Sequence, residues 1–509
     1  MVFLVVGLGL VGLALYLRLR IFIGKRPGGV DTWYYLASAE ALRQQKRLPI
    51  TLSQYLLHDP YESYPAVFPV FLALLPQAFL RNNFWLISPI IDCIHLLALY
   101  LLSFRLTDSV FAAGLAGLIY AVTPQLISET RNLNGRAFAS LLLTVCMIVL
   151  LRSVIPSSSA TSSFLGSGST ALWIVAIVLI AILYNTHTST TIAFLVSVAL
   201  LSVVSGDPRF VLAGVIGLPV AILISGGYYL RVLRNHLHAA RFWIRNVHLT
   251  RAHQVHDSPI LGSLTNGRSR SRGLYRSDIR SRLALLARLV GENPFILAML
   301  VTPVPVSDWG FAMYWWAIAI LGWSVLTTFG GPLRILGPGI HYMKASVFPS
   351  AYALAVTVNV QEGAVSLVGL AVLCAMLASF AALAYFYRVM ASRETEHTAQ
   401  TPPDLVGAAD YLRELPGKAV LVLPTMYADF VAYNAGKPVV WGGHSGDLKK
   451  FEEFFPVIRK PLNYFIHQYE VDYVLLDLAY TKPSELQADH ALIPLRSFGC
   501  MAIYETVGV

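Results

Sequence analysis

The chain has 509 residues, of which 56% are hydrophobic and only 13% are charged, and its mean hydropathy is +0.61. Soluble domains carry about 25% charged residues, so this composition excludes an ordinary soluble protein and predicts a membrane protein. In a membrane protein, the formal net charge of +10 favours lipid head groups or phosphorylated substrates over nucleic acid as partners.

The apolar residues are grouped in long runs, many of them near the ~20 residues that a helix needs to cross a bilayer. Backbone polar groups in lipid must be satisfied within the segment, so these runs are predicted to be helices. The first run shows no signal-peptide cleavage site and is expected to be retained. Roughly eleven spans are expected: Val2–Ile23, Phe84–Phe104, Val110–Ala121 (extending to Ile127), Ala137–Leu151, Ala171–Leu183, Thr190–Val204, Val211–Leu230, Leu283–Leu300, Phe311–Thr328, Ala345–Val358 and Ala364–Phe386.

We therefore divide the chain into an all-α polytopic membrane domain, residues 1–391, and a small soluble α/β domain, residues 392–509. Two segments of the first domain break the pattern of spans. Residues 24–83 form a first outer loop, whose end, Tyr64–Ala78, is apolar enough for a half-inserted helix or a further span. Residues 231–282 form a basic loop that is rich in arginine and histidine.

The C-terminal domain alternates helix and strand signals, which is typical of a small α/β fold. Helical periodicity is present in Leu405–Leu415 and in Lys450–Tyr469. Strands are expected at Ala419–Leu423, Tyr433–Val440 and Tyr473–Leu478. Because open strands are not tolerated in lipid, this domain must lie on one face of the membrane.

The sharpest local motif, Gly28–Tyr35, places Asp31 next to a cluster of Trp and Tyr after the first span. One interpretation makes Asp31 the N-cap of a helix over Thr32–Gln45, accepting a backbone N–H. The other makes it a catalytic carboxylate that takes a proton from an attacking group. The two roles are compatible.

Ser128–Arg136 joins two predicted spans and holds one acid, Glu129, beside Arg131 and Arg136. Such a loop is often a solvated turn at the membrane boundary. It is also suited to bind phosphate, because the planar guanidinium binds phosphate oxygens in a bidentate manner.

Polar groups also mark other span boundaries. Asn185–Thr190 contains His187, and its hydroxyls could cap the following helix. Another set, Arg334, His341 and Lys344, is suited to lipid head groups or to a substrate phosphate. Asp92 and His95 lie within an apolar run, where a hydrogen bond between helices is as plausible as a functional role.

These motifs, in this order, resemble the GT-C superfamily of membrane glycosyltransferases, and most of all the catalytic subunit of oligosaccharyltransferase. The likeness covers most of the chain, although each motif is short. It rests on Asp31–Leu36, Ser63–Pro69, Ala121–Pro124 with the charged loop after it, Tyr184–Thr190, Tyr427–Phe430 and Trp441–Gly446.

The resemblance implies a polyprenyl phosphate or diphosphate sugar donor, an active site facing away from the cytoplasm, and inversion at the sugar carbon. By position in the family, Asp31 would be the catalytic acid/base residue and Glu129 the second carboxylate. The remaining implied roles are donor binding by Arg131, Arg136, His187, Arg334, His341 and Lys344, and acceptor binding by Tyr427, Asp429 and His444.

Two family features are missing. Arg131–Gly135 carries asparagines where oligosaccharyltransferases have acids that help to hold a metal, and hard cations need charged oxygen ligands. A divalent cation such as Mg²⁺ or Mn²⁺ is therefore not favoured. The Trp-Trp-Asp motif that reads the acceptor is replaced by Thr425–Asp429, which favours a lipid, glycan or protein hydroxyl as acceptor over a protein asparagine.

The chain is expected to be a multi-pass integral membrane protein with its C-terminal domain outside, and the membrane would be the cytoplasmic membrane if the source is a prokaryote. The distribution of arginine conflicts with this orientation, because the arginines of the first outer loop and of the basic loop would lie outside, against the positive-inside rule. Two other functions stay open at this point: a transporter or flippase for an anionic lipid or solute, and an inactive accessory subunit on the same scaffold.

Overall fold

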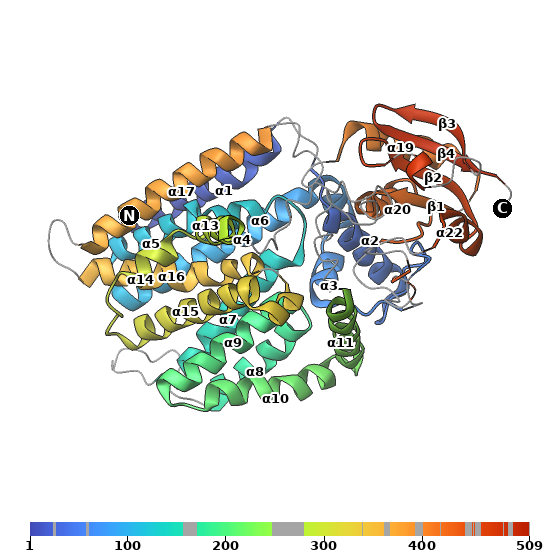
Figure 1. Ribbon diagram of the computed structural model, residues 1–509. Coiled ribbons are helices and arrows are strands. Elements are labelled where there is room, and N and C mark those ends of the chain that lie inside the picture. Colours follow the sequence, from blue (N-terminus) through green and yellow to red (C-terminus); the bar gives the residue numbers. More distant parts are fainter. Residues whose placement is uncertain are drawn as a thin grey trace.

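Long apolar helices form a bundle at one end of the molecule, and a small sheet domain lies at the other (Figure 1). This computed structural model describes residues 1–23, 27–57, 61–155, 170–246, 279–337, 339–360, 367–391, 401–417, 419–442, 450, 452–453, 460–481, 483–486 and 492–507. Between the bundle and the sheet domain lie α2 (Val30–Gln45) and α3 (Val67–Leu74), both from the first outer loop.

The bundle is built from helices that follow the predicted apolar runs closely. They are α1 (Val2–Leu19) continued by η1 (Arg20–Phe22), α4 (Gln77–Thr107), α5 (Val110–Val122), α6 (Pro124–Glu129), α7 (Gly135–Val154), α8 (Thr170–Tyr184), α9 (Thr188–Ser205), α10 (Arg209–Ile224), α11 (Tyr228–Asn246), α13 (Ile279–Glu292), α14 (Phe295–Leu300), α15 (Asp308–Phe329), η3 (Gly331–Leu336), α16 (Ile340–Val360) and α17 (Leu367–Ala391).

Six of the described helical segments are long and apolar enough to cross a membrane, so the chain is a multi-pass membrane protein. They are Val2–Phe22, Gln77–Thr107, Gly135–Val154, Thr188–Ser205, Asp308–Phe329 and Leu367–Arg388. The bent pair α10 and α11 would be a seventh span if it crossed as one unit. Two further apolar helices, α5 and α8, are shorter, and the expected count of eleven stays a prediction.

Three predicted segments are broken in the structure. The stretch Tyr64–Ala78 is not a further span, because its helix α3 has eight residues and reaches only about 12 Å. The predicted span Leu283–Leu300 is divided into α13 and α14 at Asn293 and Pro294. The predicted span Val211–Leu230 ends early, since α10 and α11 meet at a bend of 118°.

The bend between α10 and α11 lies at two adjacent glycines. Gly226 and Gly227 have φ angles of 59° and 85°, a region that glycine adopts without steric cost. The backbone thereby leaves the helix after Ile224 and begins a new helix at Tyr228. As a result α11 runs across the direction of the long helices, at the end of the bundle nearest the sheet domain (Figure 1).

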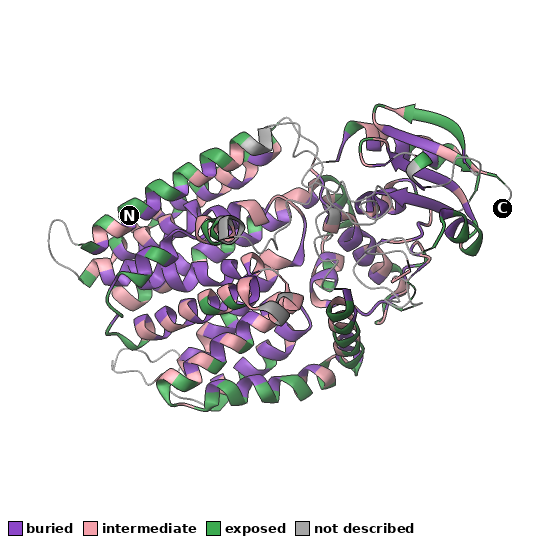
Figure 2. Cartoon of the chain, viewed as in Figure 1, coloured by how far each residue is buried: buried purple, intermediate pink, exposed green. Residues whose placement is uncertain are grey.

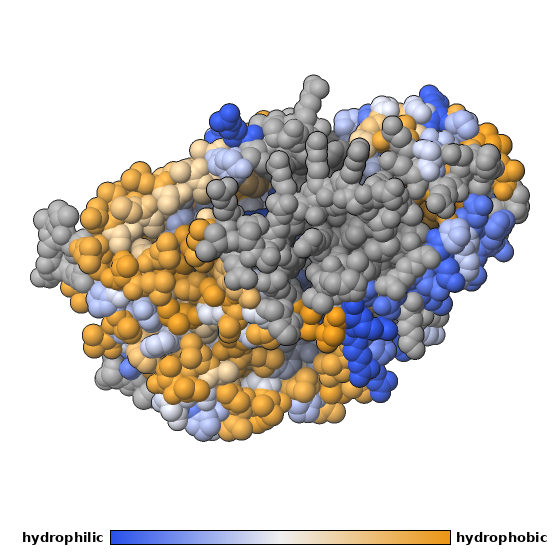
Figure 3. Space-filling model, in the orientation of Figure 1, coloured by the Kyte–Doolittle hydropathy of each residue, from blue (hydrophilic) through white to orange (hydrophobic). Residues whose placement is uncertain are grey.

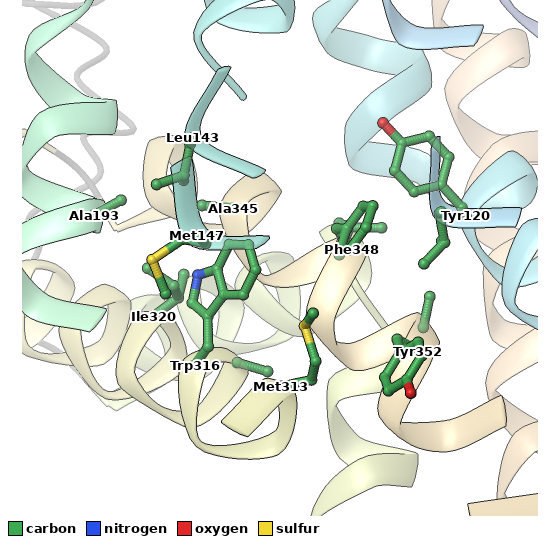
Figure 4. Close-up of a cluster of buried hydrophobic side chains, with 14 of the residues drawn as sticks. Tyr120, Leu143, Met147, Ala193, Met313, Trp316, Ile320, Ala345, Phe348 and Tyr352 are labelled. Atoms are coloured by element: carbon green, nitrogen blue, oxygen red, sulfur yellow. The ribbon is translucent and has the colours of Figure 1, made fainter. Parts of the chain in front are cut away.

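Large side chains from several helices fill the centre of the bundle (Figure 4). Trp316 of α15 is fully buried and lies near Met147 of α7 and Ala345 of α16. Along α16 almost every side chain is buried, which identifies it as the central helix of the bundle. The outward surfaces of α1, α10 and α17 are exposed and apolar, as a lipid-facing surface requires (Figures 2 and 3).

The C-terminal domain has a four-stranded sheet of order β1-β2-β4-β3, with β1 parallel to β2 and the other pairs antiparallel. Its strands are β1 (Ala419–Leu423), β2 (Val471–Asp477), β3 (Leu492–Phe498) and β4 (Met501–Thr506). The helices around the sheet are α19 (Pro403–Glu414), α20 (Ala428–Asn434) and α22 (Leu462–Gln468), with the short turns η5 (Thr425–Tyr427) and η6 (Pro483–Leu486).

The prediction of a strand over Tyr433–Val440 was wrong, because the first two of these residues belong to α20. Only Val439 pairs, through isolated parallel bridges to Val420 of β1 and to Tyr55 of the first outer loop. Trp33 of α2 also packs against Phe430 of α20, with ring centroids 5.1 Å apart. The first outer loop and the sheet domain therefore share one continuous core.

Candidate active site

Ionisable side chains from five parts of the chain meet at the end of the bundle that faces the sheet domain. They come from the start of α2, the end of α6, the start of α7, the residue before α9 and the start of α16. The structure brings together five of the predicted site residues, which interact electrostatically with one another: Asp31, Glu129, Arg136, His187 and Lys344.

Asp31 is held in place by contacts between the first outer loop and the loop before α7. Thr32 donates from Oγ1 to the Gly28 carbonyl at 3.0 Å and accepts the backbone N–H of Leu133 at 3.2 Å. The N-cap of α2 is Gly29, at φ 117°, and Asp31 is the second residue of the helix. The N-cap interpretation of Asp31 was therefore wrong, although an acid in the first turn still interacts favourably with the helix dipole.

Glu129 and Arg136 form an ion pair with Nη1 to Oε distances of 3.1 and 3.3 Å. Asn134 fixes the loop between them: its side chain accepts the Arg136 N–H at 2.9 Å and donates to the Glu129 carbonyl at 3.1 Å. Burial works to raise the pKa of the Glu129 carboxyl, but Arg136, Lys344 and His341 outweigh it and lower this pKa to about 2. Glu129 is therefore ionised at neutral pH.

Asp31 also interacts electrostatically with Arg136, so this arginine is influenced by two carboxylates. His187 completes this side of the site. Burial, reinforced by Lys344 and Arg136, holds the pKa of His187 well below its usual range. A neutral imidazole can donate one hydrogen bond and accept another, and Ser189 already lies 3.0 Å from its Nδ1.

Lys344 is the most unusual member of the cluster. Its residue is only 5% exposed, and its Nζ has no hydrogen-bond partner among the described residues. Burial lowers the pKa of Lys344 to about 7, because the raising effect of Glu129 offsets it only in part and Arg136 lowers the pKa further. Since Glu129 is already paired with Arg136, the Lys344 amino group is left as a donor of hydrogen bonds to a further anion, which would favour its charged form.

Two of the other predicted donor-binding residues interact electrostatically with Glu129. Arg131 interacts with Glu129 and also with Glu292 at the end of α13. His341 lies in the first turn of α16 and acts on Glu129. Arg334 belongs to η3, and its side chain lies outside the described part of the structure. The donor-binding roles of these three residues stay predictions.

Of the predicted acceptor-binding residues, Tyr427 and Asp429 are not part of the cluster. Tyr427 and Asp429 are 4% and 5% exposed, in the core between the sheet domain and the first outer loop. Tyr427 lies 3.5 Å from Asp477 through its hydroxyl, and Asp429 interacts with Tyr55. His444 lies outside the described residues. A role in acceptor binding stays a prediction for all three.

Asp92 and His95 belong to a separate network in the bundle. Asp92 forms a buried ion pair with Arg18 of α1. The hydroxyl of Tyr120 lies 2.8 Å from both Asp92 Oδ1 and His95 Nδ1, and Thr144 lies 2.8 Å from His95 Nε2. These contacts join α1, α4, α5 and α7, in accord with the interpretation that Asp92 and His95 form hydrogen bonds between helices. The two residues share Tyr120 as their partner.

The residues of the cluster do not fit a divalent cation. No group of three or more His, Cys, Asp or Glu side chains among the described residues is arranged to hold a metal ion. Glu129, the best placed carboxylate, already binds Arg136, and Lys344 adds a further positive charge. A divalent cation at this position would be repelled by Arg136 and by the charged form of Lys344.

Three residues near the cluster were not predicted from the sequence. Tyr35 and Tyr64 both interact with Asp31, and burial raises the pKa of the Tyr64 phenol to about 12, so it is neutral. Glu292 interacts with Arg131. The sequence signals for the tyrosines were the aromatic run at residues 33–35 and the motif Ser63–Pro69, although neither tyrosine was assigned a role. The position of Glu292 depends on the break before Pro294.

No protein-family model matches the sequence, and no curated protein sequence matches it. The structure is similar to the crystal structure of the oligosaccharyltransferase of Archaeoglobus fulgidus in the apo form, with TM-score 0.56 and 13% identity over 97% of this chain and 73% of that chain. A structure of that enzyme with an inhibitory peptide and a dolichol-phosphate gives TM-score 0.54, with 14% identity over 99% and 74% of the two chains. Its complex with Zn and sulfate gives TM-score 0.53, with 15% identity over 99% and 73%.

A likeness at this level of identity concerns the fold. The predicted resemblance is confirmed to that extent: the protein has the GT-C fold of the archaeal oligosaccharyltransferase.

Proposed function

We propose that the protein is a glycosyltransferase that moves a sugar from a polyprenyl phosphate or diphosphate donor to an acceptor on the extracytoplasmic side of the membrane. The observation that carries this proposal is the buried Lys344 amino group, which has no hydrogen-bond partner among the described residues and interacts electrostatically with Arg136. An anion beside this group would accept its hydrogen bonds and stabilise its charged form, and the donor phosphate would be such an anion.

The fold supports a lipid-linked phosphate as that anion. A structure of the archaeal oligosaccharyltransferase of the same fold holds a dolichol-phosphate together with an inhibitory peptide. In the present chain, Arg136 and Lys344 lie at the end of the bundle, where a lipid could present its phosphate while its tail stays in the bilayer. Charge-assisted hydrogen bonds from these two groups would bind phosphate oxygens about twice as strongly as neutral donors would.

In the proposed reaction, Asp31 accepts the proton of the acceptor hydroxyl as the hydroxyl oxygen forms its bond to the anomeric carbon. The bond between that carbon and the phosphate oxygen breaks, and its electron pair leaves with the lipid phosphate. Arg136 and Lys344 stabilise the charge that grows on this leaving group. Attack opposite the leaving group inverts the sugar carbon. Glu129 holds Arg136 in position.

The test is transfer of labelled sugar from a polyprenyl-phosphate donor in membranes that contain the wild-type protein, Asp31→Asn or Asp308→Asn. Loss of the base is expected to lower the rate by about 10² to 10⁴. Asp308→Asn is the matched control, because Asp308 also lies in the first turn of a helix and is exposed. Normal turnover by Asp31→Asn would overturn its catalytic role. If the wild-type protein moves an anionic lipid across vesicles and transfers no sugar, the transporter alternative replaces this proposal.

A further inference from the structure

The first part of the basic loop at residues 231–282 belongs to α11 (Tyr228–Asn246). The reaction proposed above does not use this helix. Of its 19 residues none is acidic, whereas four are arginine and two are histidine. The helix runs across the long helices at the end of the bundle, where its surface is strongly hydrophilic and borders the broad hydrophobic surface of the bundle (Figures 1 and 3). A helix at such a border between apolar and polar surface is suited to the depth of the lipid head groups.

The inner face of α11 is firmly attached to the rest of the protein. Tyr228 donates from its hydroxyl to the Tyr64 carbonyl at 2.6 Å, and His236 lies 2.8 Å from the Thr188 hydroxyl. At the far end, Arg245 forms an ion pair with Glu452 at 3.1 Å. The orientation of the helix is thereby set, and so is the face that it turns outward.

The outward face has an apolar edge and a basic stripe. Leu230, Leu237 and Ile244 are 38%, 52% and 55% exposed and recur every seven residues, which aligns them along one line of the helix. Arg234 and Arg241 have the same spacing, are exposed and lie next to this line. Neither makes an ion pair within the part of the chain that the structure describes.

This arrangement is the one that interfacial helices use. An apolar edge of Leu and Ile enters the boundary between head groups and acyl chains, while arginines on the adjoining stripe attract anionic lipids. Arginine side chains can bury their stems against the apolar edge and extend the guanidinium to the phosphates. A helix facing only water would leave the apolar edge uncovered.

We propose that the exposed face of α11, formed by Leu230, Arg234, Leu237, Arg241 and Ile244, binds anionic phospholipid head groups at the bilayer surface. Because the opposite face of the helix contacts Tyr64 and Thr188, both next to the charged cluster, bound lipid also braces one wall of the site. The proposal concerns bulk phospholipid and does not depend on sugar transfer.

The experiment is native mass spectrometry of the full-length protein in detergent, titrated separately with phosphatidylglycerol and with phosphatidylcholine. The wild-type protein is expected to bind phosphatidylglycerol more tightly. In Arg234→Gln/Arg241→Gln this affinity is expected to fall about 30-fold, from about 1 kcal/mol for each arginine. Binding of phosphatidylcholine is expected to be unchanged in this variant.

The control is Arg47→Gln/Arg496→Gln, which removes two exposed arginines elsewhere and is expected to leave the affinity for phosphatidylglycerol unchanged. An unchanged affinity in the α11 variant would overturn the proposal. The proposal would also be overturned if the α11 variant lost its binding of polyprenyl phosphate, titrated in the same way, but kept its binding of phosphatidylglycerol. The exposed face of α11 would then bind the donor. A far-ultraviolet circular dichroism spectrum equal to that of the wild type shows that the variant is folded.

Discussion

Lys344 and Glu129 lie in one cluster but differ in how their charges are compensated. Glu129 has Arg136 as a direct partner and a pKa of about 2, so it stays ionised over the whole neutral range. Lys344 is more deeply buried than Glu129, and it lacks a hydrogen-bond partner among the described residues. Burial lowers the pKa of Lys344 to about 7, so an anionic ligand that stabilises its charged form would bind favourably.

We therefore expect Lys344→Met to weaken binding of the donor while leaving the protein at least as stable as the wild type. The KM for the donor should rise by one or two orders of magnitude, as expected for one charge-assisted contact of roughly 1.5–3 kcal/mol. A residue with a purely structural role would instead lower the melting temperature. Both quantities are measurable on the purified protein by a transfer assay and by thermal unfolding.

The matched control is Lys437→Met in the sheet domain. Its Nζ donates to the carbonyls of Leu415 and Gly417, each at 2.7 Å, so this ammonium is already satisfied. Its loss should lower the stability of the sheet domain and leave the KM unchanged. The opposite pattern, with Lys344→Met destabilised and its KM normal, would contradict the role of Lys344 in donor binding.

At the scale of elements, one glycine sets how the first outer loop meets the loop before α7. Gly29 has φ 117°, and an added Cβ would lie 2.7 Å from the side chain of Asn132. Ser88 in turn donates to the Asn132 carbonyl at 2.9 Å, so this neighbour is fixed. The start of α2, and Asp31 with it, therefore rests on a position that only glycine fills without strain.

Gly29→Ala should accordingly lower kcat strongly, by tenfold or more, because a displacement of Asp31 by a fraction of an ångström spoils its alignment. The melting temperature should also fall, since both the backbone and the contact are strained. Gly12→Ala is the control, because a Cβ there meets nothing within 4 Å and the helix should tolerate or prefer alanine. Equal activity of the two variants would mean that Asp31 is not positioned by this loop.

The sequence predicted the long helices well because burial in lipid demands continuous apolar runs, and β1 because all five of its residues are apolar. It missed β3, whose middle residues are exposed, and it missed β4 beside it. The predicted strand Tyr433–Val440 wrongly included the last two residues of α20. The two adjacent glycines, Gly226 and Gly227, are a sequence signal for the break between α10 and α11. The apolar run around them nevertheless led to the prediction of one continuous span.

The candidate site was predictable to a similar degree. Asp31, Glu129, Arg136, His187 and Lys344 are polar groups at the ends of apolar runs, and ends on the same side of a membrane can meet. Their convergence in one cluster was expected from resemblance alone. The lack of a partner for Lys344 could not be predicted, because it depends on which neighbours reach it in three dimensions.

At the scale of the whole molecule, the contact between the first outer loop and the sheet domain restricts the topology. Tyr55 pairs with Val439, and Trp33 packs on Phe430, so both parts must lie on the same face of the membrane. The number of spans between them is therefore even. This conclusion holds whichever of the two faces it is.

Reporter fusions after Arg47 and at the C-terminus should thus give the same location, in agreement with this contact. The proposed function further requires both reporters to be outside, despite the positive-inside rule. Two reporters on opposite sides would contradict the arrangement of the domains, whereas two reporters inside would contradict only the proposed reaction. A third reporter between α17 and α19 checks the side on which the last described apolar helix ends.

The bridge between Tyr55 and Val439 also has a consequence for biosynthesis. Leu56 and Leu57 donate to the carbonyls of Val439 and Val440, each at 3.0 Å, so part of the first outer loop is supported by residues translated several hundred codons later. Until the ribosome reaches them, the first outer loop lacks its partner and its aromatic residues stay uncovered. Contacts so distant along the chain form slowly, which makes the nascent protein inactive until translation is nearly finished.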